Sequence, residues 1–196
     1  FFVQNESSRN LLQSIGFNNV KVSGDTRFYR VVSILERDNS LDFIEQFKDN
    51  KTTIVIGSSW PKDESLLVNY INQTNEKVKF IIAPHNIKVE QIQELKNSIT
   101  KKTVLFSEKE NTDLSNYNVL IVDTIGILTK IYSYAEIAYV GGGFGNPGIH
   151  NILEPATFGI PIIVGPNFTN FAEAVALVHQ EGCISINTQT ELNETL

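Results

Sequence analysis

The sequence predicts an α/β fold in which helices cover both faces of a doubly wound parallel sheet, the architecture called Rossmann-like. Short runs of aliphatic and β-branched residues, such as Thr53-Ile54-Val55-Ile56, are typical of strands buried on both faces. Amphipathic segments alternate with these runs from residue 41 onwards. Hydrophobic residues make up 41% of the 196 residues, which is enough for a buried core.

The predicted elements follow one another regularly after a less regular start. Residues 1–22 are predicted to form a strand, a helix over 6–15 that Gly16 ends, and a second strand; helices within 29–35 and over 41–48 follow. The predicted strands of the main sheet are 53–56, 78–83, 103–106, 119–122, 137–140, 161–164 and 184–186. The helices predicted between them are 61–72, 89–99, 126–133, 151–158 and 171–181, and residues 107–116 are predicted to be a loop.

The composition excludes several classes of protein and site. A net charge of −6 and the absence of a Lys/Arg run argue against a nucleic-acid partner. The single cysteine, Cys183, excludes a disulfide framework and is predicted to be a small buried residue. Three scattered histidines form no ligand cluster for a metal. The chain lacks methionine and an apolar run of membrane-spanning length, and we expect a soluble piece of a longer protein.

Polar and glycine-rich clusters follow the predicted strands where each one ends. Because the carboxyl ends of parallel strands meet at one edge of a sheet, and ligands bind along that edge, we expect these clusters to converge there. The clusters are residues 57–60, 84–85, 123–126, 141–151 and 165–170.

The glycine-dense stretch 140–154 is the strongest candidate for a nucleotide site. A strand, a loop rich in glycine and a predicted helix carrying His150, Asn151 and Glu154 would present backbone N–H groups to a phosphate. Asn151 and Glu154 would share a helix face, where the carboxylate can accept two ribose hydroxyls. The literal GxGxxG is discounted as a dinucleotide fingerprint because it lies late in the chain and Pro147 interrupts it.

Each candidate also has an ordinary structural interpretation. Asn151 with Glu154 could simply cap a helix, and so could Asp123 in Asp123-Thr124-x-Gly126. Ser58 and Ser59 could be a loop followed by a cap. Further structural interpretations are a solvent-facing side chain for His85, a solvated charge for Arg27 and a packing role for Trp60.

A resemblance to one family links these residues. Residues 140–173, VGGGFGNPGIHNILEPATFGIPIIVGPNFTNFAE, resemble the signature of the 3-deoxy-D-manno-octulosonic acid (Kdo) transferases of Gram-negative bacteria. Residues 122–128, VDTIGIL, resemble the GDT-x-GEL motif of that family, and residues 1–28 resemble the segment that joins its two halves. The resemblance implies a GT-B glycosyltransferase, with residues 1–30 as the interdomain segment and first elements packing on the domain, residues 31–196 as the donor-binding domain, and the N-terminal acceptor domain absent.

The resemblance also implies the site residues. The nucleotide contacts would be Pro84, His85, Gly126, Ile127, Leu128, Asn151, Ile152, Leu153 and Glu154, and Arg27 would stabilise the transition state. Weaker candidates are Ser58, Ser59, Thr124, Gly142, Gly143, His150 and Asn170. Three positions depart from the family pattern, because His85 replaces an arginine, Ile127 a glutamate and Ile149 a glycine.

The implied reaction is an inverting transfer of Kdo from CMP-Kdo to a lipid A precursor at the cytoplasmic face of the inner membrane. It implies no metal and no cofactor. The general base would be a glutamate of the missing domain, so we expect this chain to be inactive alone. Two alternatives stay open: another GT-B enzyme, such as a UDP-dependent transferase or epimerase, and a non-catalytic α/β binding module.

Overall fold

The computed structural model describes residues 1–74 and 77–196, which divide into two compact units, Phe1–Asp38 and Asn39–Leu196. The sequence-based boundary at residue 30 would cut the helix α2 (Thr26–Val32), whereas the division after Asp38 keeps that helix whole.

The first unit is a small α/β segment. Its strands β1 (Phe2–Val3) and β2 (Lys21–Val22) pair in parallel on either side of α1 (Glu6–Ser14). The helix α2 begins three residues before the predicted 29–35, because the Asp25 side chain accepts the N–H of Arg27 and starts the helix there.

The second unit contains a seven-stranded sheet in the order β5-β6-β4-β3-β7-β8-β9, in which every pairing is parallel. The predicted doubly wound α/β fold is therefore confirmed. The chain leaves the central β3 in one direction and returns to its other side at β7, so the carboxyl ends of β3 and β7 flank the switch point where such sheets bind ligands. The strands are β3 (Thr52–Ser59), β4 (Val78–Pro84), β5 (Thr103–Leu105), β6 (Val119–Ile121), β7 (Ile137–Val140), β8 (Ile162–Val164) and β9 (Cys183–Ser185).

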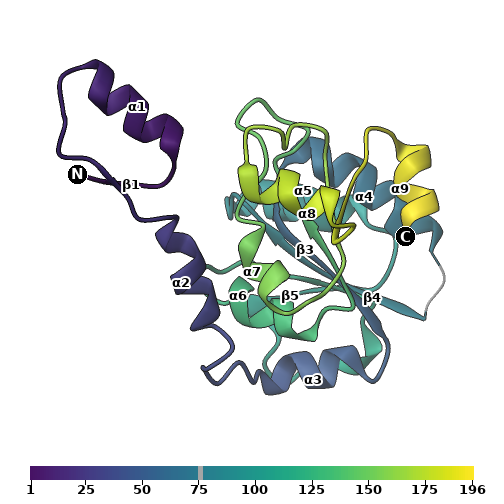
Figure 1. Cartoon of the computed structure of the whole chain (residues 1–196). Helices are drawn as coiled ribbons and strands as arrows, with labels where there is room; N and C mark the ends of the chain where they lie inside the picture. The colour runs from purple at the N-terminus through teal and green to yellow at the C-terminus, as the bar shows by residue number, and fades with distance from the viewer. Residues whose placement is uncertain (75–76) are drawn as a thin grey trace. The chain divides into compact units, whose positions relative to one another are not determined.

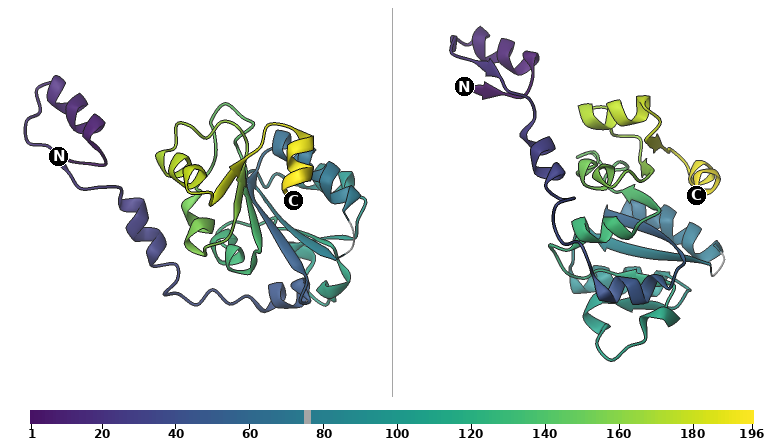
Figure 2. Two further views of the ribbon diagram at one scale, coloured as in Figure 1. Left: turned by 45° about the vertical axis from the view of Figure 1, so that its right-hand side comes forward. Right: turned by 60° about the horizontal axis from the view of Figure 1, so that its bottom comes forward.

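Helices cover both faces of this sheet (Figure 1). One face carries α3 (Asp42–Lys48), α6 (Leu128–Ile131) and α8 (Ala172–His179), and the short α7 (Leu153–Thr157) follows the glycine loop. The other face carries α4 (Pro61–Gln73), α5 (Val89–Ser98) and α9 (Gln189–Thr195). Figure 2 shows the yellow α9 beside α4, and the two helices are in contact.

Successive side chains of a strand point to opposite faces of the sheet, which explains why helices pack on both faces. Val55 faces the cluster that contains Phe47 of α3, whereas Ile54 and Ile56 face the cluster that contains Leu67 of α4. Strands with both faces covered need apolar residues at successive positions, which is the pattern that the sequence has. Cys183 is 3% exposed and lies in the first cluster, as predicted.

Three local predictions were wrong. The strand β3 continues through Ser58 and Ser59, which were predicted to follow it as a loop, and the sheet register shifts there because Ser58 has a φ of 53°. A short 3-10 turn, Phe106–Glu108, begins at the last residue of the predicted strand 103–106, and a second one, Leu114–Asn116, lies in the predicted loop. The third, the start of α7, belongs to the candidate site. Within the ranges described, no helix is long and apolar enough to cross a bilayer.

Candidate functional site at the carboxyl edge of the sheet

The carboxyl ends of the central strands are joined by backbone hydrogen bonds. His85 N donates to Ser59 O at 2.9 Å, which links the end of β4 to the end of β3. Asn167 N donates to Gly143 O at 2.9 Å, which links the loop after β8 to the glycine loop after β7. Gly141 N donates to Gly57 O at 2.9 Å, which joins these two pairs. The predicted convergence is therefore confirmed for four clusters, 57–60, 84–85, 141–151 and 165–170.

A buried carboxylate, Asp63, joins α4 to β7 and the glycine loop. Its Oδ2 accepts the backbone N–H of Trp60 and of Gly142, each at 2.9 Å, and its Oδ1 accepts the hydroxyl of Tyr139 at 2.8 Å. Burial, and then the charge of Asp63, raise the pKa of Tyr139. Sequence reasoning missed Asp63; the available signal was an aspartate at the third position of a helix that begins with Pro61.

Three rings stack beside Asp63. Trp60 Nε1 donates to His150 Nε2 at 2.8 Å. The His85 ring lies 4.5 Å from the Trp60 ring at 15° and 4.4 Å from the His150 ring at 27°, measured between centroids. Burial lowers the pKa of His150, and the charge of His85 lowers it further. Trp60, predicted only to pack, is therefore part of the candidate site.

Glu154 is held by two side chains from different segments. Thr129 of α6 donates to its Oε2 at 2.6 Å, and Asn151 Nδ2 donates to its Oε1 at 2.9 Å. Thr129 directly follows the predicted site residue Leu128 and was not itself predicted. These bonds bring the 126–129 segment to the 151–154 segment.

The prediction that a helix carries His150 and Asn151 was wrong, because α7 begins only at Leu153. Asn151 Oδ1 accepts the N–H of Leu153 at 3.2 Å, so this side chain turns the backbone just before the helix, as asparagine commonly does. Asn151 and Glu154 nevertheless meet. The predicted proximity of the two residues holds, whereas Asn151 is not the cap of the helix, because Ile152 occupies the N-cap position without a side-chain capping bond.

Most amides of the glycine loop already have acceptors within the protein. Those of Gly141, Gly145 and Gly148 donate to carbonyl groups of Gly57, Gly142 and Gly145, that of His150 donates to Gly141, and that of Gly142 donates to Asp63. The expectation that these N–H groups hold a phosphate was therefore wrong for these five. Bare backbone is needed here for packing instead: a Cβ on Gly143 would lie 2.7 Å from the Cα of Gly165.

Other predicted residues are placed as follows. Pro84 ends β4, Ile127 precedes α6, and Gly126 has a φ of +90°, which favours glycine. Ile152 and Leu153 are buried in the start of α7, whereas Asn170 is exposed in a turn before α8. The buried Ser59 donates its hydroxyl to Glu64 Oε1 at 2.9 Å, and Thr124 lies in a half-buried bend.

Asp123 does not cap a helix. Its carboxylate accepts the backbone N–H of Ser107 at 2.9 Å and the hydroxyl of Ser107 at 2.5 Å, which joins the ends of β6 and β5. Arg27 belongs to the first unit, where its guanidinium pairs with Asp25 at 2.6 Å. This pairing holds the pKa of Asp25 below its ordinary value.

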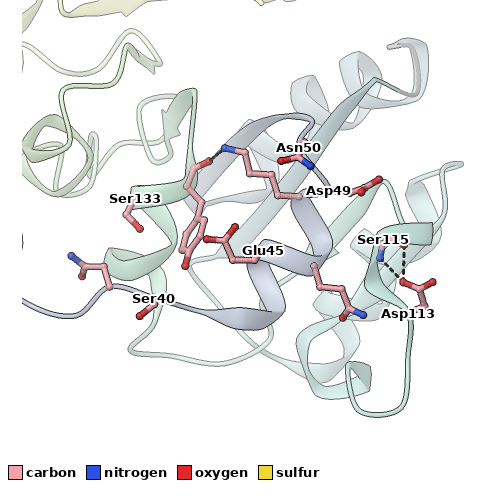
Figure 3. Close-up of a pocket in the computed structure, with 11 residues that line it drawn as sticks. Ser40, Glu45, Asp49, Asn50, Asp113, Ser115 and Ser133 are labelled. Atoms are coloured by element: carbon pink, nitrogen blue, oxygen red, sulfur yellow. Dashed lines mark hydrogen bonds between the residues drawn. The ribbon is translucent and has the colours of Figure 1, made fainter.

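A cavity lies elsewhere, at the amino ends of the strands (Figure 3). It measures about 850 Å³, and its lining residues precede β3, β6 and β7; they include Ser40, Glu45, Asp49, Asn50, Asp113, Ser115 and Ser133. At the carboxyl edge, a cavity of about 20 Å³ lies between Ser59, Glu64 and Pro84. Burial raises the pKa of Glu64 there. No group of three or more His, Cys, Asp or Glu among the residues described is arranged to hold a metal.

Comparison with known proteins shows which proteins this chain resembles. No family model matches the chain. The chain is 30% identical to a 3-deoxy-D-manno-octulosonic acid transferase of Chlamydophila psittaci over 175 residues, which are 85% of this chain and 39% of the relative. It is 36% identical to the enzyme of that name from Aquifex aeolicus over 124 residues, 62% of this chain and 33% of the relative. The chain spans less than half the length of these relatives.

Solved structures share the fold. The C-terminal CMP-Kdo binding domain of WaaA from Acinetobacter baumannii matches with a TM-score of 0.66 and 21% identity, over 87% of this chain and 88% of that one. Anabaena Alr3699/HepE in complex with UDP-glucose matches with a TM-score of 0.52 and 15% identity, over 99% of this chain and 52% of that one. The resemblance in sequence is confirmed: the chain is a relative of the 3-deoxy-D-manno-octulosonic acid transferases and has the α/β fold of the WaaA C-terminal domain.

Proposed function

We propose that this chain is the donor-binding part of a Kdo transferase and binds the CMP moiety of CMP-Kdo at the carboxyl edge of its sheet. Relatives of that name match along 85–99% of the chain in several cases. The matched structure from Acinetobacter baumannii is described as a CMP-Kdo binding domain.

The arrangement of Glu154 is the observation that carries the proposal. Thr129 and Asn151 each occupy one of its oxygens with a single hydrogen bond, which fixes the direction of the carboxylate. An ionised carboxylate offers about four lone-pair positions, so acceptor capacity remains for two ribose hydroxyls. His85, exposed at the same edge, would face the phosphate as the cation that replaces the arginine of the family.

The remaining parts of the reaction belong to the same proposal. Kdo would pass to a lipid A precursor bound by a second domain that also supplies the general base, without a metal ion. Arg27 would stabilise charge on the departing CMP, since a nearby cation favours the developing phosphate charge. The intact enzyme would act at the cytoplasmic face of the inner membrane, and this chain by itself would not catalyse the transfer.

A UDP-sugar enzyme is the second candidate, because the same fold occurs in a protein complexed with UDP-glucose. The fold alone does not distinguish a site for cytosine from a site for uracil. Cytosine and uracil differ in their hydrogen-bonding edges, and UDP also carries a second phosphate, so an affinity comparison of CMP with both UMP and UDP separates them.

Calorimetric titration tests the proposal. We expect CMP to bind more tightly than UMP and UDP, and Glu154→Gln to weaken CMP binding by about 1–3 kcal/mol, the scale of a hydrogen bond to a charged group. The matched control is Glu90→Gln, the same change at an exposed position of α5. Thr129→Val removes one bond to Glu154 but keeps the carboxylate, so its effect should be smaller. Tighter binding of UMP and UDP would favour the second candidate, and binding of none of the three would favour a non-catalytic module.

A further inference from the structure

We propose that Trp60, His85 and His150 act as one anion-binding unit that takes up a proton together with the nucleotide phosphate. In this unit Trp60 makes His150 a neutral hydrogen-bond donor and leaves His85 to carry the positive charge. The inference rests on the proposed function, because it takes the anion to be the phosphate of CMP.

The indole N–H determines the protonation of His150. Tryptophan Nε1 can only donate, so His150 Nε2, 2.8 Å away, must present its lone pair. The proton of the neutral imidazole is then on Nδ1. Protonating Nε2 as well would set two N–H groups against each other, and burial and the charge of His85 also lower the pKa of this histidine.

His85 is the ring that can be charged. Its side chain is exposed, its backbone N–H is anchored on Ser59 O, and its ring lies over the Trp60 ring at 4.5 Å with an angle of 15°. A cation over an indole face is stabilised by the electron-rich face of the ring. Because His150 stays neutral, the stacked pair can hold one positive charge without like-charge repulsion.

The neighbouring carboxylates accept hydrogen bonds from groups other than the two histidines. Asp63, the acidic group that acts on His150 from α4, accepts three hydrogen bonds. Glu64, next on α4, accepts the hydroxyl of Ser59, and Glu154 of α7 accepts bonds from two other side chains. Lys88, which precedes α5, adds a positive charge after the His85 loop. We therefore take an incoming phosphate to be the anion that a protonated His85 ring attracts.

Proton uptake has a definite sign. A phosphate beside His85 favours the charged imidazole, so binding of the anion and binding of a proton support each other. Affinity is then strongest at low pH and falls as the pH rises through the neutral range, by at most about tenfold per pH unit for one proton. The phosphate of CMP itself titrates near pH 6, so a reference protein with a fixed cation is needed.

His85→Arg is that reference. We expect the CMP affinity of the native chain to fall by about tenfold relative to His85→Arg between roughly pH 6.5 and pH 8.5. An equal pH dependence in both proteins would overturn the inference while leaving the proposed function intact. If neither protein binds CMP, the result contradicts the proposed function itself.

Nitrogen-15 NMR tests the role of Trp60 without any ligand. The chain has only three histidines, so His85→Arg, His179→Gln and the native protein together assign every ring. We expect His150 to carry its proton on Nδ1 in the native protein and to lose this strict preference in Trp60→Phe, which keeps a ring but removes the donor. His179, exposed at the end of α8, should not change. A proton on Nε2 of His150 in the native protein would overturn the inference.

Discussion

Among single residues, Asp63 shows how a carboxylate can be fully buried beside the candidate site. Its carboxylate is 0% exposed and accepts two backbone N–H groups and one hydroxyl, which replace the water it loses. These donors come from the start of α4, from β7 and from the glycine loop. One side chain therefore holds three segments of the edge at fixed distances.

Removing this carboxylate should be costly. We expect Asp63→Ala to lower the free energy of unfolding by about 2–4 kcal/mol, because three buried donors lose their acceptor. Urea denaturation followed by circular dichroism measures the change. Lys62→Ala, the exposed neighbour, should stay within about 0.5 kcal/mol. A loss for Asp63→Ala no larger than that of Lys62→Ala would show that the bonds contribute little.

Sequence reasoning found some of these residues and missed others for a physical reason. His85, Asn151 and Glu154 were proposed from their place after a strand and from the family resemblance. Trp60 was assigned only a packing role and the long-range bonds of Asp63 were missed because these partners lie 76 to 90 residues away in the chain. The local position of Asp63 in the first turn of a helix indicates a bond to the start of that helix and nothing further. A side chain whose role depends on such contacts becomes visible only once the strands are ordered.

Among the elements, two loops touch backbone to backbone at glycine. A Cβ on Gly143 would lie 2.7 Å from the backbone of Gly165, and a Cβ on Gly165 would lie 2.7 Å from Gly143. Neither neighbour is a flexible side chain that could move aside. The glycines of the loop therefore let β7 and β8 end in close contact, which fixes the glycine loop beside the three rings.

Alanine at this contact should strain the edge. We expect Gly143→Ala to destabilise the protein by about 1–3 kcal/mol, the usual cost of overpacking, in the same urea experiment. The matched control is Gly182→Ala, whose Cβ would meet only ordinary contacts at 3.5 and 3.8 Å. That change should be close to neutral. Equal effects at both positions would argue against a special contact at Gly143.

Prediction of the elements was more complete than prediction of their ends. Each strand of the large sheet was predicted from an apolar run, because both faces are covered. The ends of β3 and the start of α7 were misplaced, since they depend on the φ of Ser58 and on the Asn151 side chain rather than on periodicity. Both errors fall at the candidate site, where local geometry departs from regular structure.

At the scale of the whole molecule, the chain consists of two compact units joined near Asp38. The second unit has an extensive core on both faces of its sheet, whereas the first buries few of its apolar side chains. Parallel strands and alternating helices could be predicted from the sequence. The strand order and the boundary between units could not, because they depend on contacts between distant segments.

This division predicts where a protease cuts first. Arg37 is exposed in an irregular segment just before the boundary. We expect limited trypsin digestion of the native chain to leave a resistant fragment of residues 38–196, identified by mass spectrometry, because locally open backbone is cleaved most readily. Early cuts within the large sheet, at a rate similar to the cut at Arg37, would contradict independent units.

The stack of rings also has an optical consequence. Trp60 is the single tryptophan of the chain, so all indole fluorescence comes from the candidate site. Its ring is in contact with two imidazoles, one through a hydrogen bond and one through stacking. A protonated imidazole quenches indole fluorescence more strongly than a neutral one, because it accepts an electron from the excited ring more readily. The emission of this protein therefore reports the charge of the candidate site without any attached dye.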